Sequence, residues 1–103
     1  MTSVVVWKFR LFFGSGGTNV GMARGTKVLT AQMKNGEPFL WALVDPDAPT
    51  VARHFVIVGT GTPFNHPDYK EYVATFQDGP FVWHVFETDR AKTVIAVTRE
   101  QAS

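Results

Sequence analysis

The chain has 103 residues, of which 45% are apolar and 18% charged. This composition excludes a disordered chain, and the length predicts a single domain, residues 1–103. Ten Lys and Arg residues against nine Asp and Glu leave no basic field for nucleic acid or an anionic membrane, and the absence of cysteine excludes disulfides. Residues 4–7 are apolar, but Lys8 follows at once, so we expect no signal peptide or membrane span and a cytoplasmic protein.

The first predicted strand covers residues 5–13, where apolar side chains alternate with Lys8 and Arg10. A period of two is typical of a strand with one buried and one solvent-facing side. Residues 14–17 are rich in glycine and predict a loop, after which residues 18–22 return as a short strand. The face of the first strand that we expect to be buried consists of Val5, Trp7, Phe9, Leu11 and Phe13.

The next two strands, residues 27–34 and 38–44, are separated by Asn35-Gly36. Both turn residues accept the positive φ of a type I′ turn, so the strands should pair antiparallel. In the first of them we expect alternate residues on opposite faces, as the strict period of a strand requires. One face then carries Leu29, Ala31 and Met33, and the other Val28, Thr30 and Gln32.

The run Phe39–Val44 is the most apolar internal stretch, and Asp45-Pro46 ends it. Because no residue in it is polar, we expect the strand to lie in the middle of a sheet with both faces covered. A domain of this size has few strands to cover it, so part of this surface should face a second copy of the chain. We therefore expect a homo-oligomer, such as a two-fold dimer.

The second half of the chain predicts further short strands, separated by Pro- and Gly-rich turns. Between them, residues 59–67 predict a loop, and Asp68–Glu71 one helical turn. This pattern favours an all-β fold, a compact antiparallel β-sandwich or partly open barrel of about seven strands, with a core over about residues 4–87. The remaining predicted strands are residues 53–58, 72–77 and 81–87, with residues 88–103 as an edge strand (93–98) or a tail.

Several short motifs occur in order between about residues 6 and 87. They are Trp7-Lys8, Met22 with Gly25, Leu40–Pro46 with Ala48-Pro49, Gly59-Thr60-Gly61, Thr75-Phe76-Gln77 and Trp83–Glu87. In these motifs the chain resembles a family of small uncharacterised proteins from bacteriophages and bacteria. The resemblance implies a phage or prophage context, in the host cytoplasm if a phage encodes the protein, and no known activity. The chain departs from the family pattern at Ala23, at Thr62, where histidine is frequent, and beyond Glu87.

The loop Gly59-Thr60-Gly61-Thr62 offers backbone amides and two hydroxyls, which suit a phosphate or other anionic oxygen. The competing interpretation is a turn that merely needs glycine, because both nucleotide-loop fingerprints are missing. Asp45 and Asp47 are similarly ambiguous as acid–base carboxylates, since Asp-Pro-Asp is also a turn sequence.

No metal or catalytic site is predicted. The histidines at 54, 66 and 84 lack the spacing of a known metal motif, even with Asp45 or Asp68 as a further ligand. The serines occur near the termini or in the glycine-rich loop, so none is a convincing nucleophile. We expect no cofactor, and binding is favoured over catalysis.

The favoured function is binding of a small, planar, anionic ligand of the nucleotide type, for which an indole supplies stacking and basic residues supply charge. Such a protein would suit sequestration of a host immune signalling nucleotide. Open alternatives are a protein-interaction module, single-stranded nucleic-acid binding through Trp7, Phe9, Lys8 and Arg10, and hydrolysis of a signalling nucleotide with His84 or Asp45 as base. The candidate ligand-binding residues are Trp7, Lys8, Arg10, Trp41, Asp45, Arg53, Gly59, Thr60, Gly61, Thr62 and His84.

Overall fold

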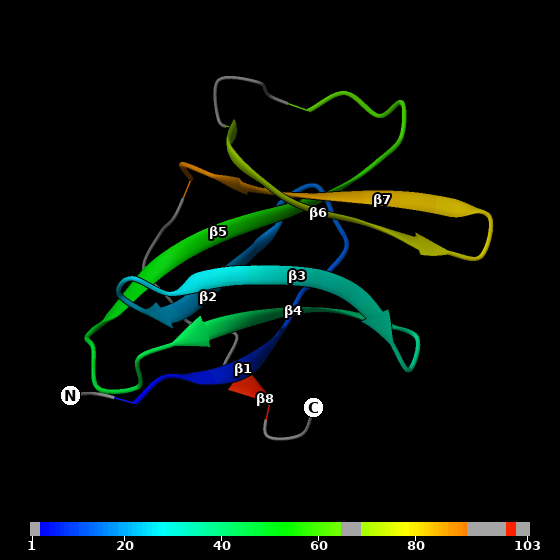
Figure 1. The fold of residues 1–103 in the computed structure, drawn as a ribbon. Helices are drawn as coiled ribbons and strands as arrows, with labels where there is room; N and C mark the ends of the chain where they lie inside the picture. Colours follow the sequence, from blue (N-terminus) through cyan, green and yellow to red (C-terminus); the bar gives the residue numbers. More distant parts are fainter. Residues whose placement is uncertain (1–2, 65–68, 91–98, 101–103) are drawn as a thin grey trace.

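A computed structural model of the chain describes residues 3–64, 69–90 and 99–100. These residues form strands and connecting turns, with no helix among them (Figure 1). The described residues therefore contain no helix that is long and apolar enough to span a membrane. The strands are β1 (Val5–Arg10), β2 (Thr18–Ala23), β3 (Lys27–Lys34), β4 (Glu37–Val44), β5 (Thr50–Gly59), β6 (Tyr69–Asp78), β7 (Phe81–Thr88) and β8 (Arg99–Glu100).

The strands form two antiparallel sheets, which confirms the predicted all-β class. Sheet A has the order β3-β4-β1-β8 and sheet B the order β2-β5-β7-β6. The sheets pack face to face as an open sandwich, with the edge strands β3 and β6 in contact. The core combines side chains of both inner faces, as expected for sheets about 10 Å apart. Its largest fully buried members are Phe9, Leu11, Val20, Met22, Leu40, Val44, Phe55 and Val85.

The apolar run before Asp45 lies in β4, between β3 and β1, as predicted. Its inward side chains, Leu40, Ala42 and Val44, are all completely buried. On the outer face Phe39 is only 5% exposed, and Trp41 and Leu43 are half-buried. Much of the outer face is thus covered within the chain itself.

The β3–β4 hairpin turns at Asn35-Gly36, whose φ angles are 52° and 79°. Both values are positive, as a type I′ turn requires, so the predicted hairpin is confirmed. The predicted faces hold for Ala31 and Met33 on the core side but are wrong for Val28 and Leu29, because a β-bulge between Val28 and Thr30 shifts the register. Val28 therefore packs on the core together with Met33, whereas Leu29 is 44% exposed.

Three further predictions need correction. Strand β1 ends at Arg10, and Phe13 beyond it is 43% exposed rather than buried. Lys8, predicted to face solvent, is only 8% exposed, because its side chain lies along Phe39 with Nζ 4.5 Å from the ring centroid. Residues 69–71 begin strand β6 rather than a helical turn, while Asp68 and the predicted strand 93–98 lie outside the described residues.

Candidate functional site

Three of the residues predicted to bind a ligand lie on the outer face of sheet A. Lys8 sits over Phe39, as described above, and Arg10 forms an ion pair of 2.6 Å with Glu37. Trp41 is half-buried opposite Lys8 in the β1–β4 ladder. Lys8 and Arg10 thus already interact with neighbouring side chains.

Trp7 lies on the opposite face of β1 from Lys8 and Arg10, where it packs against the core beside Phe9. Phe9 is itself 1% exposed. The aromatic and basic residues of β1 therefore face opposite sides of sheet A, which differs from the shared aromatic and basic surface that the sequence suggested for this strand.

Asp45 shapes the turn after β4. Its Oδ1 accepts a hydrogen bond from the Asp47 amide at 3.0 Å, and its carbonyl accepts one from the Ala48 amide at 3.1 Å. This geometry is that of an aspartate stabilising its own turn. The structure therefore favours the turn interpretation of Asp45 over the acid–base interpretation.

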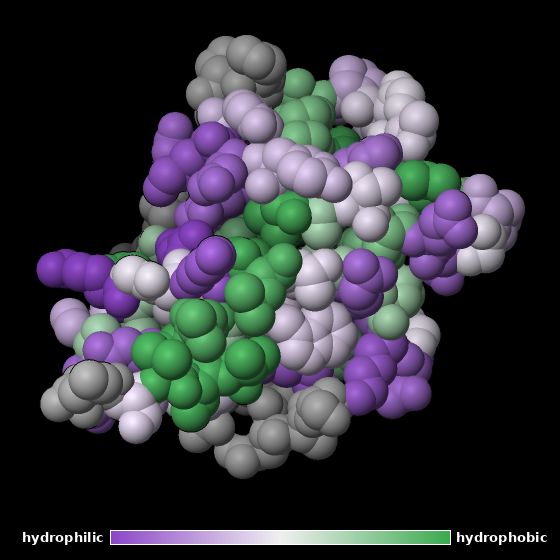
Figure 2. Space-filling view, viewed as in Figure 1, coloured by the Kyte–Doolittle hydropathy of each residue, from purple (hydrophilic) through white to green (hydrophobic). Residues whose placement is uncertain are grey.

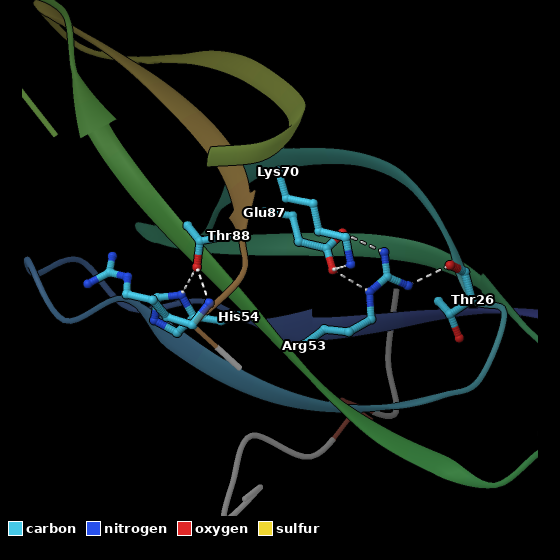
Figure 3. A network of polar contacts seen from close by, with 7 residues as sticks. Thr26, Arg53, His54, Lys70, Glu87 and Thr88 are labelled. Carbon is cyan, nitrogen blue, oxygen red and sulfur yellow. Dashed lines mark hydrogen bonds and ion pairs between the residues drawn. The ribbon is translucent and has the colours of Figure 1, made fainter. Parts of the chain in front are cut away.

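Arg53 lies between the sheets rather than at the rim of a cleft. Its Nε and Nη2 donate to the two carboxylate oxygens of Glu87, both at 2.8 Å, and Nη1 donates to the Thr26 carbonyl at 2.6 Å (Figure 3). The Glu87 side chain is only 4% exposed. Because the guanidinium is held by two bonds to one carboxylate and a third to the backbone, Arg53 serves the fold.

The predicted Gly59–Thr62 loop is a tight turn in which two amides are already used. The Thr60 amide donates to the Val82 carbonyl at 3.3 Å, and the Thr62 amide to the Gly59 carbonyl at 3.0 Å. Gly61 has φ +86°, as at the third position of a type II turn. The loop is thus a glycine-dependent turn that offers the Gly61 amide and two hydroxyls, rather than a nest of converging amides.

His84 joins this turn to sheet B. Here two of the predicted site residues, His84 and Thr60, lie in contact. The His84 Nε2 lies 2.7 Å from Thr60 Oγ1, and its Nδ1 lies 3.0 Å from Thr75 Oγ1. The Thr75 hydroxyl also contacts the Tyr72 hydroxyl at 2.8 Å. Both ring nitrogens are therefore occupied, and the imidazole orients the Thr60 hydroxyl at the surface.

A cavity of about 430 Å³ lies between this turn and the β6–β7 hairpin. We call it the hairpin cavity. Its lining residues are Gly59, Thr60, Thr62, Pro80, Phe81, Val82 and Trp83. Phe81 is 58% exposed, and its ring centroid is 5.8 Å from that of Trp83. The cavity thus combines two aromatic rings with two threonine hydroxyls, at a volume suited to a small ligand.

Trp83 is the functional candidate that the sequence did not single out. It lies opposite Gly59 in the β5–β7 ladder, and a Cβ on Gly59 would be 3.3 Å from the indole. Its Nε1 is buried and has no hydrogen-bond partner among the described residues. Only the pairing of β5 with β7 places this indole beneath the glycine turn, so no local pattern could have revealed it.

A second cavity, of about 420 Å³, lies on the other side of Gly59. We call it the edge cavity. It shares Gly59, Thr62 and Trp83 with the hairpin cavity but opens between β5 and the glycine-rich loop. Its remaining lining residues are Gly14, Ser15, Val56, Ile57, Val58, Pro63, Phe64 and Arg90.

His54 fixes the glycine-rich loop beside the edge cavity. Its side chain is buried, and Nδ1 lies 2.5 Å from the Thr88 hydroxyl (Figure 3). Its Nε2 lies 2.7 Å from the Gly16 carbonyl. A carbonyl can only accept, so in the neutral ring Nε2 carries the hydrogen and Nδ1 accepts from Thr88. His54 is therefore a structural residue, and no metal role is needed to explain it.

Metal ligands do not gather in the part of the chain that the structure describes. No group of three or more His, Asp or Glu side chains there has the geometry to hold an ion. His54 and His84 each use both ring nitrogens in the hydrogen bonds given above. His66, the third histidine, lies outside the described residues.

Comparison with known proteins places the chain in a family without giving it an activity. A family model described as a domain of unknown function, DUF7352, matches residues 2–95. No curated protein and no solved structure matches the chain. Because the family model covers nearly the whole sequence, the chain belongs to the DUF7352 family.

Proposed function

We propose that this protein is a non-enzymatic binding protein that holds a small planar ligand of the nucleotide class in the hairpin cavity. The proposal rests on one observation: the aromatic rings of Trp83 and Phe81 and the hydroxyl-bearing residues Thr60 and Thr62 line the same cavity. Aromatic rings stack on bases of any sequence, and hydroxyls bind phosphate or ribose oxygens.

The charge around the cavity favours a ligand of low charge. Arg10 and Arg53 are engaged with Glu37 and Glu87, and Lys8 lies over Phe39 on the other sheet. The side-chain polar groups of the residues that line the cavity are the hydroxyls of Thr60 and Thr62 and the indole NH of Trp83. A nucleoside or a nucleotide with a single phosphate group fits this set better than a polyphosphate does. Sequestration of a signalling nucleotide of this size is the use that we favour.

We expect calorimetry with nucleosides, nucleoside monophosphates and cyclic mononucleotides to find at least one ligand that binds with one-to-one stoichiometry. Phe81→Ala should weaken that binding about 5- to 150-fold, because base–aromatic stacking contributes about 1–3 kcal/mol per base. The matched control is Phe12→Ala, which removes another exposed ring, 48% accessible and stacked on Arg10. If no nucleotide binds the folded protein, or if Phe81→Ala binds as tightly as the parent, the proposal is wrong.

A second candidate function, interaction with another protein chain, is favoured by the outer face of sheet A. Figure 2 shows apolar side chains gathered over the ends of β1 and β4. On this face Val4 and Val6 are each 55% exposed, Leu29 is 44% exposed, and Leu43 lies opposite Val6 in the β1–β4 ladder. A contiguous exposed apolar patch is typical of an interface, and we propose a second copy of the chain as its partner.

Light scattering after size exclusion should therefore give the mass of a dimer. Val6→Glu should shift the protein to a monomer, because it places a charge at the centre of the apolar patch. Gln77→Glu, at an exposed position of β6 in sheet B, adds the same charge elsewhere and should leave the dimer intact. A parent protein that is monomeric at all concentrations measured would rule out this interface.

A further inference from the structure

The outer half of β5 lacks a strand neighbour on one side. Strand β2 pairs with β5 only from Thr50 to Phe55, and the last pair is Thr18 with Phe55. Beyond it, Val56–Gly59 pair with β7 alone among the strands that the structure describes. These four residues extend over about 13 Å, at roughly 3.3 Å per residue. Within the described ranges 3–64, 69–90 and 99–100, the sheet therefore has an open edge next to the edge cavity.

The backbone groups that face this edge follow from the ladder on the other side. The Thr60 amide donates to Val82 of the paired strand, so the even-numbered residues here direct their backbone groups toward β7. Ile57 and Gly59 consequently direct theirs toward the open edge, since alternate residues of a strand bond to opposite sides. The Gly59 carbonyl accepts from Thr62, which leaves the Ile57 amide and carbonyl and the Gly59 amide for a further strand.

The chain itself leaves the position next to this edge. Continuing the register of Thr18 with Phe55 would place Gly16 opposite Ile57. Instead the loop turns away, with Gly17 at φ +69° and its amide bonded to the Gly14 carbonyl at 3.1 Å. Gly14 and Ser15 form the far wall of the edge cavity rather than a continuation of β2.

The loop is held in this open position by two side chains. The His54 Nε2 group bonds the Gly16 carbonyl at 2.7 Å, and the Thr18 hydroxyl accepts a hydrogen bond from the Phe12 amide at 2.8 Å. His54 is 2% exposed and Thr18 is 4% exposed. Because both anchors are buried, the gap between the loop and β5 is built into the fold.

We propose that residues 56–59 form a strand-addition site that binds an extended peptide segment from a partner protein, distinct from the nucleotide-type ligand of the hairpin cavity. Strand addition supplies backbone hydrogen bonds and reads alternate side chains. An extended backbone presents amide and carbonyl groups at the spacing that Ile57 and Gly59 require. The segment runs antiparallel to β5 in line with β2, and Val56, Val58 and Phe64 favour aliphatic side chains.

The test uses the full chain labelled with ¹⁵N and a pool of acetylated pentapeptides built from Val, Ile, Thr and Glu. We expect the amide resonances of Ile57 and Gly59 to shift and their hydrogen exchange to slow at least tenfold. The same pool with alternate backbone nitrogens methylated should have no effect, because methylation removes the donors of the strand. Unchanged Ile57 and Gly59 amides in the presence of the unmethylated pool would overturn the proposal.

A pair of substitutions separates this site from the hairpin cavity. Ser15→Phe fills the edge cavity from the exposed loop and should weaken peptide binding at least tenfold, whereas Ser15→Ala should change it less than twofold. Phe81→Ala should retain the response to the peptide pool, even though it weakens binding in the hairpin cavity. A response to the pool that Ser15→Phe leaves intact would place the peptide elsewhere and contradict the inference.

Discussion

Glu87→Ala is expected to lower the free energy of unfolding by about 3–5 kcal/mol, because it leaves the Arg53 guanidinium between the sheets without its carboxylate partner. The Glu87 side chain is 4% exposed and that of Arg53 19%, so solvent cannot replace the lost interaction fully. Lys70, whose Nζ is 4.0 Å from Glu87, is no substitute because it carries the same charge as Arg53. Urea denaturation followed by circular dichroism measures this loss of stability. The same substitution should lower Tm by more than about 10 °C.

The control for this prediction is an exposed ion pair in the same protein. Arg10 and Glu37 are 2.6 Å apart, but their side chains are 34% and 43% exposed. Glu37→Ala should therefore cost only about 0.2–1 kcal/mol. The double variant Arg53→Met with Glu87→Leu should recover much of the loss, because it buries no unpaired charge. Equal effects of Glu87→Ala and Glu37→Ala would show that the buried pair contributes no more than a surface pair.

Gly17→Ala is expected to destabilise the fold by more than about 3 kcal/mol. Gly17 has φ +69°, and a Cβ there would lie 2.5 Å from the Phe55 carbonyl and 2.7 Å from the His54 ring. The positive φ alone costs roughly 1–2 kcal/mol for an alanine. The contact adds to this cost, because the Phe55 carbonyl and the His54 ring would both have to move away from the new methyl group. That movement would break the pairing of Thr18 with Phe55 and the hydrogen bond from His54 to Gly16.

Gly25→Ala separates the contact from the backbone strain. Gly25 has a similar φ of +82°, but a Cβ there would meet nothing within 4 Å. We expect this variant to lose only about 1–2 kcal/mol in the same denaturation experiment. If the two alanine variants are equally stable, the close approach of Gly17 to β5 does not matter for folding.

Much of the strand pattern was predictable, because it depends on local chemistry. The alternation in β5 places Phe55 and Ile57 on the core face and His54 on the other, as predicted. The same alternation holds for Trp83 and Val85 in β7. The prediction failed only at the start of β3, where a bulge between Val28 and Thr30 inserts one residue without a distinctive sequence. Val28 therefore takes the place of Leu29 on the core face, which Ala31 and Met33 share as predicted.

The candidate site was predicted only in part. The Gly59–Thr62 loop and His84 were both selected from the sequence, but their meeting depends on the β5–β7 register, which pairs Val58 with His84. That register also brings Trp83 beneath Gly59. The ion pairs of Arg10 and Arg53 could not be predicted either, since their partners Glu37 and Glu87 are distant in sequence.

Side-chain period and turn chemistry act over a few residues, so most of the strands, the Asn35-Gly36 hairpin and the central position of β4 were predictable from the amino-acid order. Other features required the folded chain: the pairing of Arg53 with Glu87, the bond from His54 to Gly16, and the cavity between an indole and a glycine turn. These contacts join residues on different strands. They follow from the register and stacking of two sheets, which no single stretch of the chain encodes.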